Sequence, residues 1–169
     1  CPEAVDCAPS NGTCGVFCGD FVVGGDGCAE AIDCIGGDGH CTVPADAVSI
    51  GNFAFDGMDT LTSVTLGDTV TSIGVYAFRE TRLTSIAIPD LVAEIPEGAF
   101  KSIPTLESVT FGSSLTSIGD YAFQSAESIT ELVLPDSVMQ VGQRCFQSSR
   151  YMRNLTIGSG ISEIPGSAF

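Results

Sequence analysis

The sequence predicts a repeat solenoid preceded by a short cysteine-rich module. Two observations predict this arrangement. Seven of the eight cysteines lie between Cys1 and Cys41, and beyond them phenylalanine recurs at nearly equal intervals to the end of the chain. We therefore divide the chain into a cysteine-rich cap or linker, residues 1–41, and about six repeats, residues 42–169, of which the first is shortened.

The cysteine-rich module is a duplication. CPEAVDCAPSNGTC (1–14) and CAEAIDCIGGDGHC (28–41) share the spacing Cys-x5-Cys-x6-Cys and several residues between the cysteines. Such a density in a glycine-rich stretch with little core predicts disulfide bonds and an oxidising compartment. The gaps are longer than those of common zinc sites, and His40 is the only histidine. The cysteines expected to form disulfides are Cys1, Cys7, Cys14, Cys18, Cys28, Cys34 and Cys41.

An odd number of cysteines leaves one that is free or bonded to another chain. The eighth, Cys145, replaces the alanine that precedes phenylalanine in the other repeats, and it is expected to be a small buried thiol. Stacked strands lie about 4.8 Å apart, so four coils place Cys145 too far from Cys41 for a disulfide.

The repeats have a common pattern that ends in Ala-Phe or Cys-Phe. Each full block begins with L-x-x-V-x-L, whose alternation predicts a short strand. A turn follows at Pro-Asp, Gly-Asp or Gly-Ser, and V-x-x-I then predicts a second extended segment. No single block can bury its apolar residues alone, so the blocks must stack as parallel coils. The phenylalanines are Phe55, Phe78, Phe100, Phe123, Phe146 and Phe169.

These blocks resemble the BspA-type leucine-rich repeat of bacterial and protist surface proteins. The resemblance covers residues 42–169 and rests on the pattern LxxIxLPxxLxxIgxxAF. It implies a right-handed coil with a parallel β-sheet on one face and short strand, turn or 3-10 segments on the other. It also implies an extracellular, adhesive or ligand-binding protein rather than an enzyme. The cysteine that the family often has three residues after phenylalanine is replaced here by Met58, Thr81, Ile103, Ala126 and Ser149.

Composition excludes several functions. The net charge of −15 argues against nucleic acid and anionic membranes as partners, and no apolar run is long enough for membrane insertion. His40, expected to be an exposed loop residue, has no second histidine beside it, so no catalytic site and no cofactor are expected. Weak candidates for calcium lie in and near two Gly-Gly-Asp-Gly turns, without the spacing of a calcium loop: Asp20, Asp26, Asp33 and Asp38.

The outward positions of the predicted first strands form ladders of small polar residues. They offer an extended ligand-binding face for an extracellular protein or glycan. The residues of this candidate face are Ser63, Thr65, Ser85, Ser108, Thr110, Asn154 and Thr156. Asn154 also belongs to one of two N-glycosylation sequons, and the other begins at Asn11.

Charge is distributed unevenly along the chain. Residues 1–78 contain 11 acidic and no basic residues, whereas all six basic residues follow. The N-terminal module has an odd number of cysteines, and the last repeat ends on Phe169 without a polar capping block. Together with the charge distribution, these features predict head-to-tail assembly into a fibre or stalk. The interface is expected at Phe169, Ile164, Arg144, Arg150 and Arg153. The alternative is a monomeric cell-surface adhesin that uses the Ser/Thr-rich face, or a fragment of a longer protein.

Overall fold

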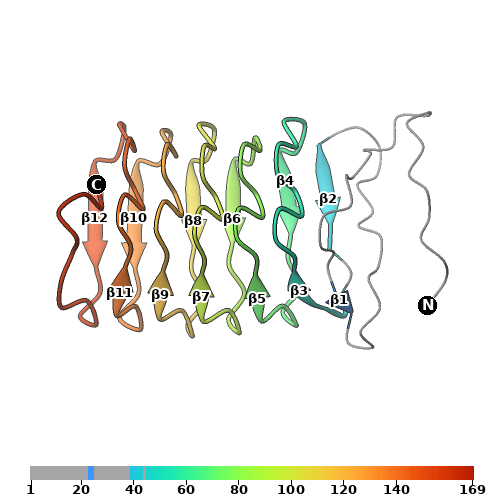
Figure 1. Ribbon diagram of the computed structural model, residues 1–169, viewed down its shortest axis with the longest axis horizontal. Coiled ribbons are helices and arrows are strands. Elements are labelled where there is room, and N and C mark those ends of the chain that lie inside the picture. Colours follow the sequence, from blue (N-terminus) through green and yellow to red (C-terminus); the bar gives the residue numbers. More distant parts are fainter. Residues whose placement is uncertain (1–22, 25–38, 44) are drawn as a thin grey trace.

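The computed structural model describes residues 23–24, 39–43 and 45–169. They form a β-solenoid of stacked coils with two columns of strands, and every coil except the last contributes one strand to each column (Figure 1). The first column contains β2 (His40–Thr42), β4 (Ser63–Thr65), β6 (Ser85–Ala87), β8 (Ser108–Thr110), β10 (Glu131–Leu134) and β12 (Asn154–Ile157). The second contains β3 (Ala47–Ile50), β5 (Ser72–Ile73), β7 (Glu94–Ile95), β9 (Ser117–Ile118) and β11 (Gln140–Val141).

Both columns have the register that the repeat period requires. The first column pairs as β2–β4, β6–β8 and β10–β12, and the second as β3–β5 and β7–β9–β11. These pairs are parallel with equivalent residues opposite each other, as in the pairing of Ser85 with Ser108 and of Gln140 with Ser117. The exception is β1 (Val23–Gly24), which pairs with β3 in the antiparallel direction. In the first column, β2 aligns Cys41 with Val64, so the first coil begins at His40.

The core is a stack of aromatic rings. Phe55, Phe78, Phe100, Phe123 and Phe146 are at most 1% exposed, and each ring stacks on the next with centroids 4.8 to 5.5 Å apart. The small residue before each phenylalanine is also buried. Offset or parallel ring pairs add to the hydrophobic free energy of burial, so the column holds successive coils together. This confirms the core predicted from the Ala-Phe repeat.

The 3-10 segments that the resemblance implied are not supported. Among the described residues the connections are turns, and the reason is the backbone conformation on either side of the ring column. The residues two before and two after each buried phenylalanine have positive φ, as in Tyr76 (53°) and Glu80 (59°) around Phe78. A 3-10 helix needs negative φ at consecutive residues, so none can extend through these positions.

The second strand column is interrupted where a proline replaces the glycine that follows the strand in other coils. Gly119 and Gly142 each donate a backbone hydrogen bond of 2.7 Å to the preceding coil, and β7, β9 and β11 form one sheet. The equivalent residue in the coil of β7 is Pro96, which has no N–H to donate, and the sheet of β5 ends there. Pro165 occupies the same position in the last coil, where no strand pairs with β11.

Candidate functional site

The first strand column presents one outward face across the solenoid. Side chains alternate along a strand, and β10 shows this directly with Leu132 and Leu134 buried and Glu131 and Val133 exposed. All seven residues of the candidate ligand face lie at the outward positions of this column. Within the strand pairs β6–β8 and β10–β12 equivalent residues lie opposite each other, so Ala87 lies opposite Thr110 and Val133 lies opposite Thr156. The structure therefore brings these residues together, and their role in binding stays a prediction.

This face offers hydrogen-bonding groups on a flat surface. Hydroxyl groups dominate it, and Glu131 and Val133 interrupt the row, Val133 being 53% exposed. At one end His40 Nδ1 lies 2.7 Å from Ser63 Oγ, and the histidine is exposed as expected. His40 was expected in a loop, but it lies in strand β2, because its backbone pairs with that of Ser63 in the next coil.

The described residues contain no group of three or more histidine, cysteine or acidic side chains that could hold a metal ion.

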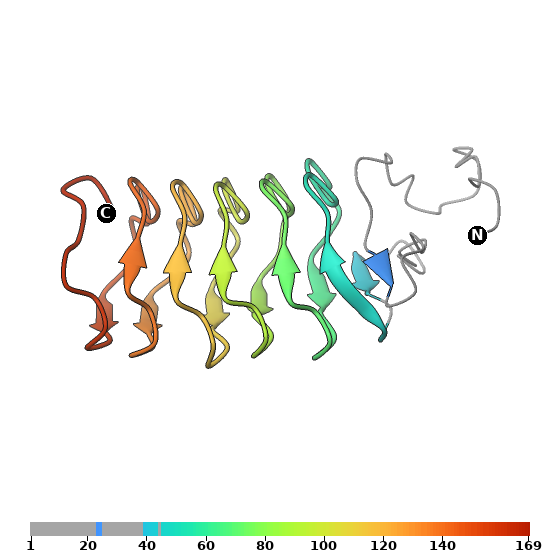
Figure 2. The same ribbon diagram turned by 60° about the horizontal axis from the view of Figure 1, so that its bottom comes forward.

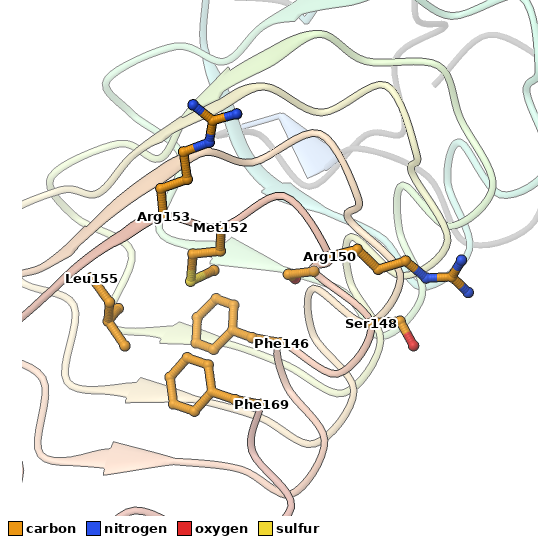
Figure 3. Close-up of a pocket in the computed structure, with 8 residues that line it drawn as sticks. Phe146, Ser148, Arg150, Met152, Arg153, Leu155 and Phe169 are labelled. Atoms are coloured by element: carbon orange, nitrogen blue, oxygen red, sulfur yellow. The ribbon is translucent and has the colours of Figure 1, made fainter.

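A second candidate surface is a hollow on the last coils, with a volume of about 390 Å³ (Figure 3). Phe169 stacks on Phe146 with ring centroids 5.3 Å apart, yet it is 48% exposed. Met152 and Leu155 complete the apolar wall, and two predicted interface cations also line the hollow, namely Arg150 and Arg153. The hollow therefore combines partly exposed apolar side chains with two cations.

The other two predicted interface residues lie elsewhere. Ile164 is 37% exposed but does not line the hollow. The guanidinium of Arg144 lies over the ring of Tyr121, 5.9 Å from its centroid. The hollow thus unites Phe169, Arg150 and Arg153, and excludes Arg144 and Ile164.

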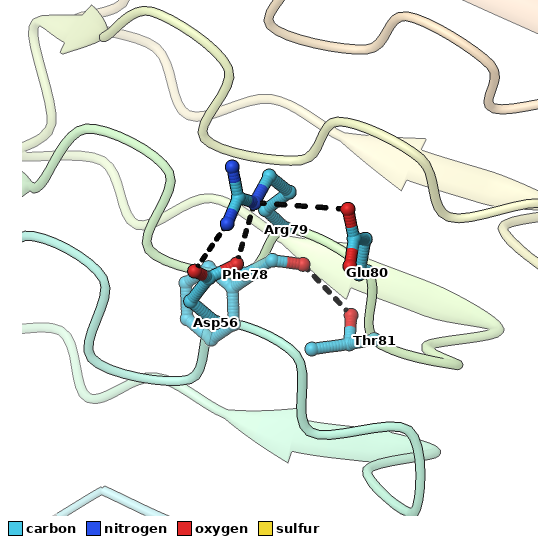
Figure 4. Close-up of polar contacts among 5 residues, drawn as sticks. All are labelled: Asp56, Phe78, Arg79, Glu80 and Thr81. Carbon is cyan, nitrogen blue, oxygen red and sulfur yellow. Dashed lines mark hydrogen bonds and ion pairs between the residues drawn. The ribbon is translucent and has the colours of Figure 1, made fainter. Parts of the chain in front are cut away.

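Sequence reasoning missed a ridge of aromatic and charged side chains beside the ring column. Tyr76 stacks on Phe53 at 5.5 Å, and Arg79 lies over the Tyr76 ring. Arg79 also donates hydrogen bonds of 2.7 and 2.6 Å to Asp56 of the preceding coil (Figure 4). The Tyr76 hydroxyl donates to Glu97, which raises the pKa of this phenol. The recurrence of tyrosine two residues before phenylalanine is the signal that could have revealed this ridge.

Cys145 is a free, buried thiol, as predicted. It occupies the alanine position of its coil, and burial raises its pKa to about 12. Because the thiolate is the reactive form, this cysteine is inert at neutral pH.

Several predicted sites lie outside the described residues. Among the expected disulfide cysteines only Cys41 lies within them, where it is 1% exposed. Asn154 is exposed in β12, and the other sequon asparagine, Asn11, is outside. The disulfide framework and the calcium candidates therefore remain predictions. Those outside the described residues are Cys1, Cys7, Cys14, Cys18, Cys28, Cys34, Asp20, Asp26, Asp33 and Asp38.

Comparison with known proteins decides the family. A model of the BspA type leucine rich repeat region matches residues 48–169 in six copies. The chain belongs to the BspA-type leucine-rich repeat family. A search of curated protein sequences found no match.

Solved structures agree with this BspA-type repeat fold. A leucine-rich repeat protein of Bacteroides ovatus is 26% identical, with a TM-score of 0.68 over 73% of this chain and 37% of its own. A leucine rich cell surface protein of Faecalibacterium prausnitzii is 27% identical, with a TM-score of 0.68 over 78% and 34%. The pneumococcal vaccine antigen PcpA is 25% identical, with a TM-score of 0.60 over 72% and 31%.

The chain thus spans about a third of the length of these three structures. None of the described residues forms a helix with the length and apolar character that crossing a membrane requires. One of these structural neighbours is a cell surface protein and another is a vaccine antigen.

Proposed function

We propose that this protein is a non-catalytic, extracellular or cell-surface recognition module that binds a protein or glycan ligand through the first strand column. The observation that carries the proposal is the outward-facing row of mostly small polar side chains on β4 to β12, which is in register within the strand pairs β6–β8 and β10–β12. A solenoid offers such a row as one continuous surface, and hydroxyl groups can donate and accept hydrogen bonds. A cell surface protein among the structural neighbours supports the location.

The test is binding of the purified chain to an array of extracellular proteins and glycans. The strand-face variant Thr65→Arg/Thr110→Arg places two large cations on the exposed column, and Ser114→Arg is the matched control on an exposed turn. We expect the double variant to lose at least tenfold in affinity for a ligand that the control still binds. Loss of binding in both variants, or in neither, would contradict the proposed face.

The extracellular location has its own test. Antibodies against the protein should label unpermeabilised source cells or their medium. Labelling that requires permeabilisation would contradict the proposal.

A second candidate function is head-to-tail assembly, and the apolar hollow on the last coils favours it. Its wall of Phe169, Met152 and Leu155 is partly exposed, and Arg150 and Arg153 carry positive charge there. The acidic N-terminal part of a second copy, residues 1–78, is complementary in charge. A contact between two different surfaces of the same chain builds an open filament unless it closes into a ring.

Sedimentation velocity over a hundredfold range of concentration tests this assembly. We expect species larger than the monomer at high concentration, and we expect Phe169→Asp to abolish them. Ile164→Asp is the matched control, because Ile164 is exposed but does not line the hollow. A wild-type chain that stays monomeric throughout would rule out the assembly.

A further inference from the structure

The second strand column has an open edge at β11. This strand is the last in the sheet β7–β9–β11. A hollow of about 710 Å³ extends along this edge, lined by residues of β11, of β7 and β9, and of the last coil within 160–165. In Figure 2 the last coil, in dark red, has no strand arrow beside β11, unlike every coil before it. Pro165 has no N–H for the bond that Gly142 makes in the preceding coil, and Ile164 remains 37% exposed.

Backbone acceptors in β11 lack the partners that their equivalents have. In β9 and the residue before it, the carbonyl of Thr116 accepts from Met139 N–H and that of Ile118 accepts from Gly142 N–H. The corresponding carbonyls one coil later belong to Met139 and Val141. Within the described part of the chain, residues 160–165 donate no backbone hydrogen bond to either. Unpaired groups at a sheet edge are a template for another strand.

The side chains around this edge select the kind of strand that fits. Glu94, Asp120 and Glu163 line the hollow and are exposed, and none of its lining residues is lysine or arginine. Its floor is apolar, formed by Ile118 and Val141. A partner must therefore combine backbone N–H donors with basic side chains and a small apolar one.

We propose that the groove beside β11 binds an extended basic segment of a partner protein, which adds a strand to the sheet β7–β9–β11. In this mode the main chain supplies hydrogen bonds and alternate side chains supply specificity. Amides of the segment donate to the carbonyls of Met139 and Val141, its apolar side chains face the floor, and its lysine or arginine side chains face the carboxylates. A second copy of this chain is a poor occupant, because its N-terminal part, residues 1–78, would bring acidic groups to an acidic groove.

Fluorescence anisotropy with a labelled octapeptide of alternating lysine and valine tests the proposal on the full chain. There are three control peptides. The first is an octapeptide of alternating glutamate and valine. The other two are versions of the lysine–valine peptide, one with the backbone amides of its valines N-methylated and one with those of its lysines N-methylated. One of these versions must remove the donors that face β11, whichever residue type provides them. We expect saturable binding of the lysine–valine peptide, none of the glutamate peptide, and a loss of at least tenfold in one N-methylated version.

Charge variants locate the binding site. We expect Glu94→Lys and Glu163→Lys each to weaken binding at least fivefold, whereas Glu107→Lys, an equal charge change at an exposed residue outside the groove, changes it less than twofold. All three side chains are exposed, so the fold is retained, which thermal melts verify. Equal weakening by all three variants, or unchanged affinity of both N-methylated peptides, would reveal general charge attraction and overturn the proposal. Absence of binding by the lysine–valine peptide would also overturn it.

Discussion

Substitution of Phe100 tests whether the stacked rings stabilise the fold. The side chain is fully buried, and its ring lies between Phe78 and Phe123 with both centroids 5.2 Å away and the planes within 2° and 8° of parallel. Removing a buried phenylalanine side chain costs about 3–5 kcal/mol through lost transfer free energy and the cavity that remains. Phe100→Leu keeps most of the apolar volume and removes both ring pairs, so we expect it to cost about 1–3 kcal/mol.

Phe169→Ala is the matched control for Phe100→Ala. Its ring is 48% exposed and has one stacking partner, Phe146. About half of the burial free energy and one ring pair are lost, so we expect about 1–2 kcal/mol. Urea unfolding followed by far-ultraviolet circular dichroism measures both variants through the shift in midpoint. A Phe100→Ala cost below about 1.5 kcal/mol, half the lower end of the range for a buried phenylalanine, would refute the ring column as the source of stability. A cost no larger than that of Phe169→Ala would refute it equally.

Three further predictions concern single residues. Gly142→Ala should lower the free energy of unfolding by about 1–3 kcal/mol, because a Cβ there would lie 2.4 Å from Asp120 N. Gly166→Ala, with open space around the added Cβ, should change the free energy of unfolding by less than about 0.5 kcal/mol. Equal shifts of the urea midpoint in the two variants would contradict this. Cys145, with its pKa raised to about 12, should resist iodoacetamide at pH 8 until the chain unfolds, as peptide mass spectrometry can measure; rapid labelling of the native protein would contradict its burial. The hydrogen bond to Glu97 raises the pKa of Tyr76 above its usual value of 10.0, so this bond stabilises the fold below about pH 10 and the stabilisation is lost as the pH rises through the folded pKa. Ultraviolet titration of the wild type should show a late-titrating component that Tyr76→Phe removes.

Most of the fold could be predicted from the repeat period in the sequence. Each buried phenylalanine and the strands of the full repeats could be located from the constant spacing, because a solenoid gives equivalent residues equivalent surroundings. The start of β2 at His40 and the missing second strand of the last coil could not. The strand-face ladders followed from the same spacing combined with side-chain alternation.

What escaped prediction depends on departures from the repeat. Pro96 and Pro165 stand where other coils have glycine, and only the hydrogen-bond ladder reveals that this exchange breaks the second column. The turns around each Ala-Phe pair depend on positive φ at residues such as Tyr76, which L-residues adopt rarely and which no apolar pattern signals. The separation of Arg144 from Arg150 and Arg153 likewise needs coordinates, since these residues lie on one coil but on different sides of it.

Chemical-shift mapping of the ligand complex by nuclear magnetic resonance shows whether the first strand column is the surface that binds the ligand. The 17.4 kDa chain is small enough for residue-specific assignment. With the tightest ligand from the array, the account predicts shifts concentrated at the exposed residues of β4, β6 and β8, including Thr65 and Thr110. Shifts confined to the turns around the ring column, with the first strand column unaffected, would contradict it.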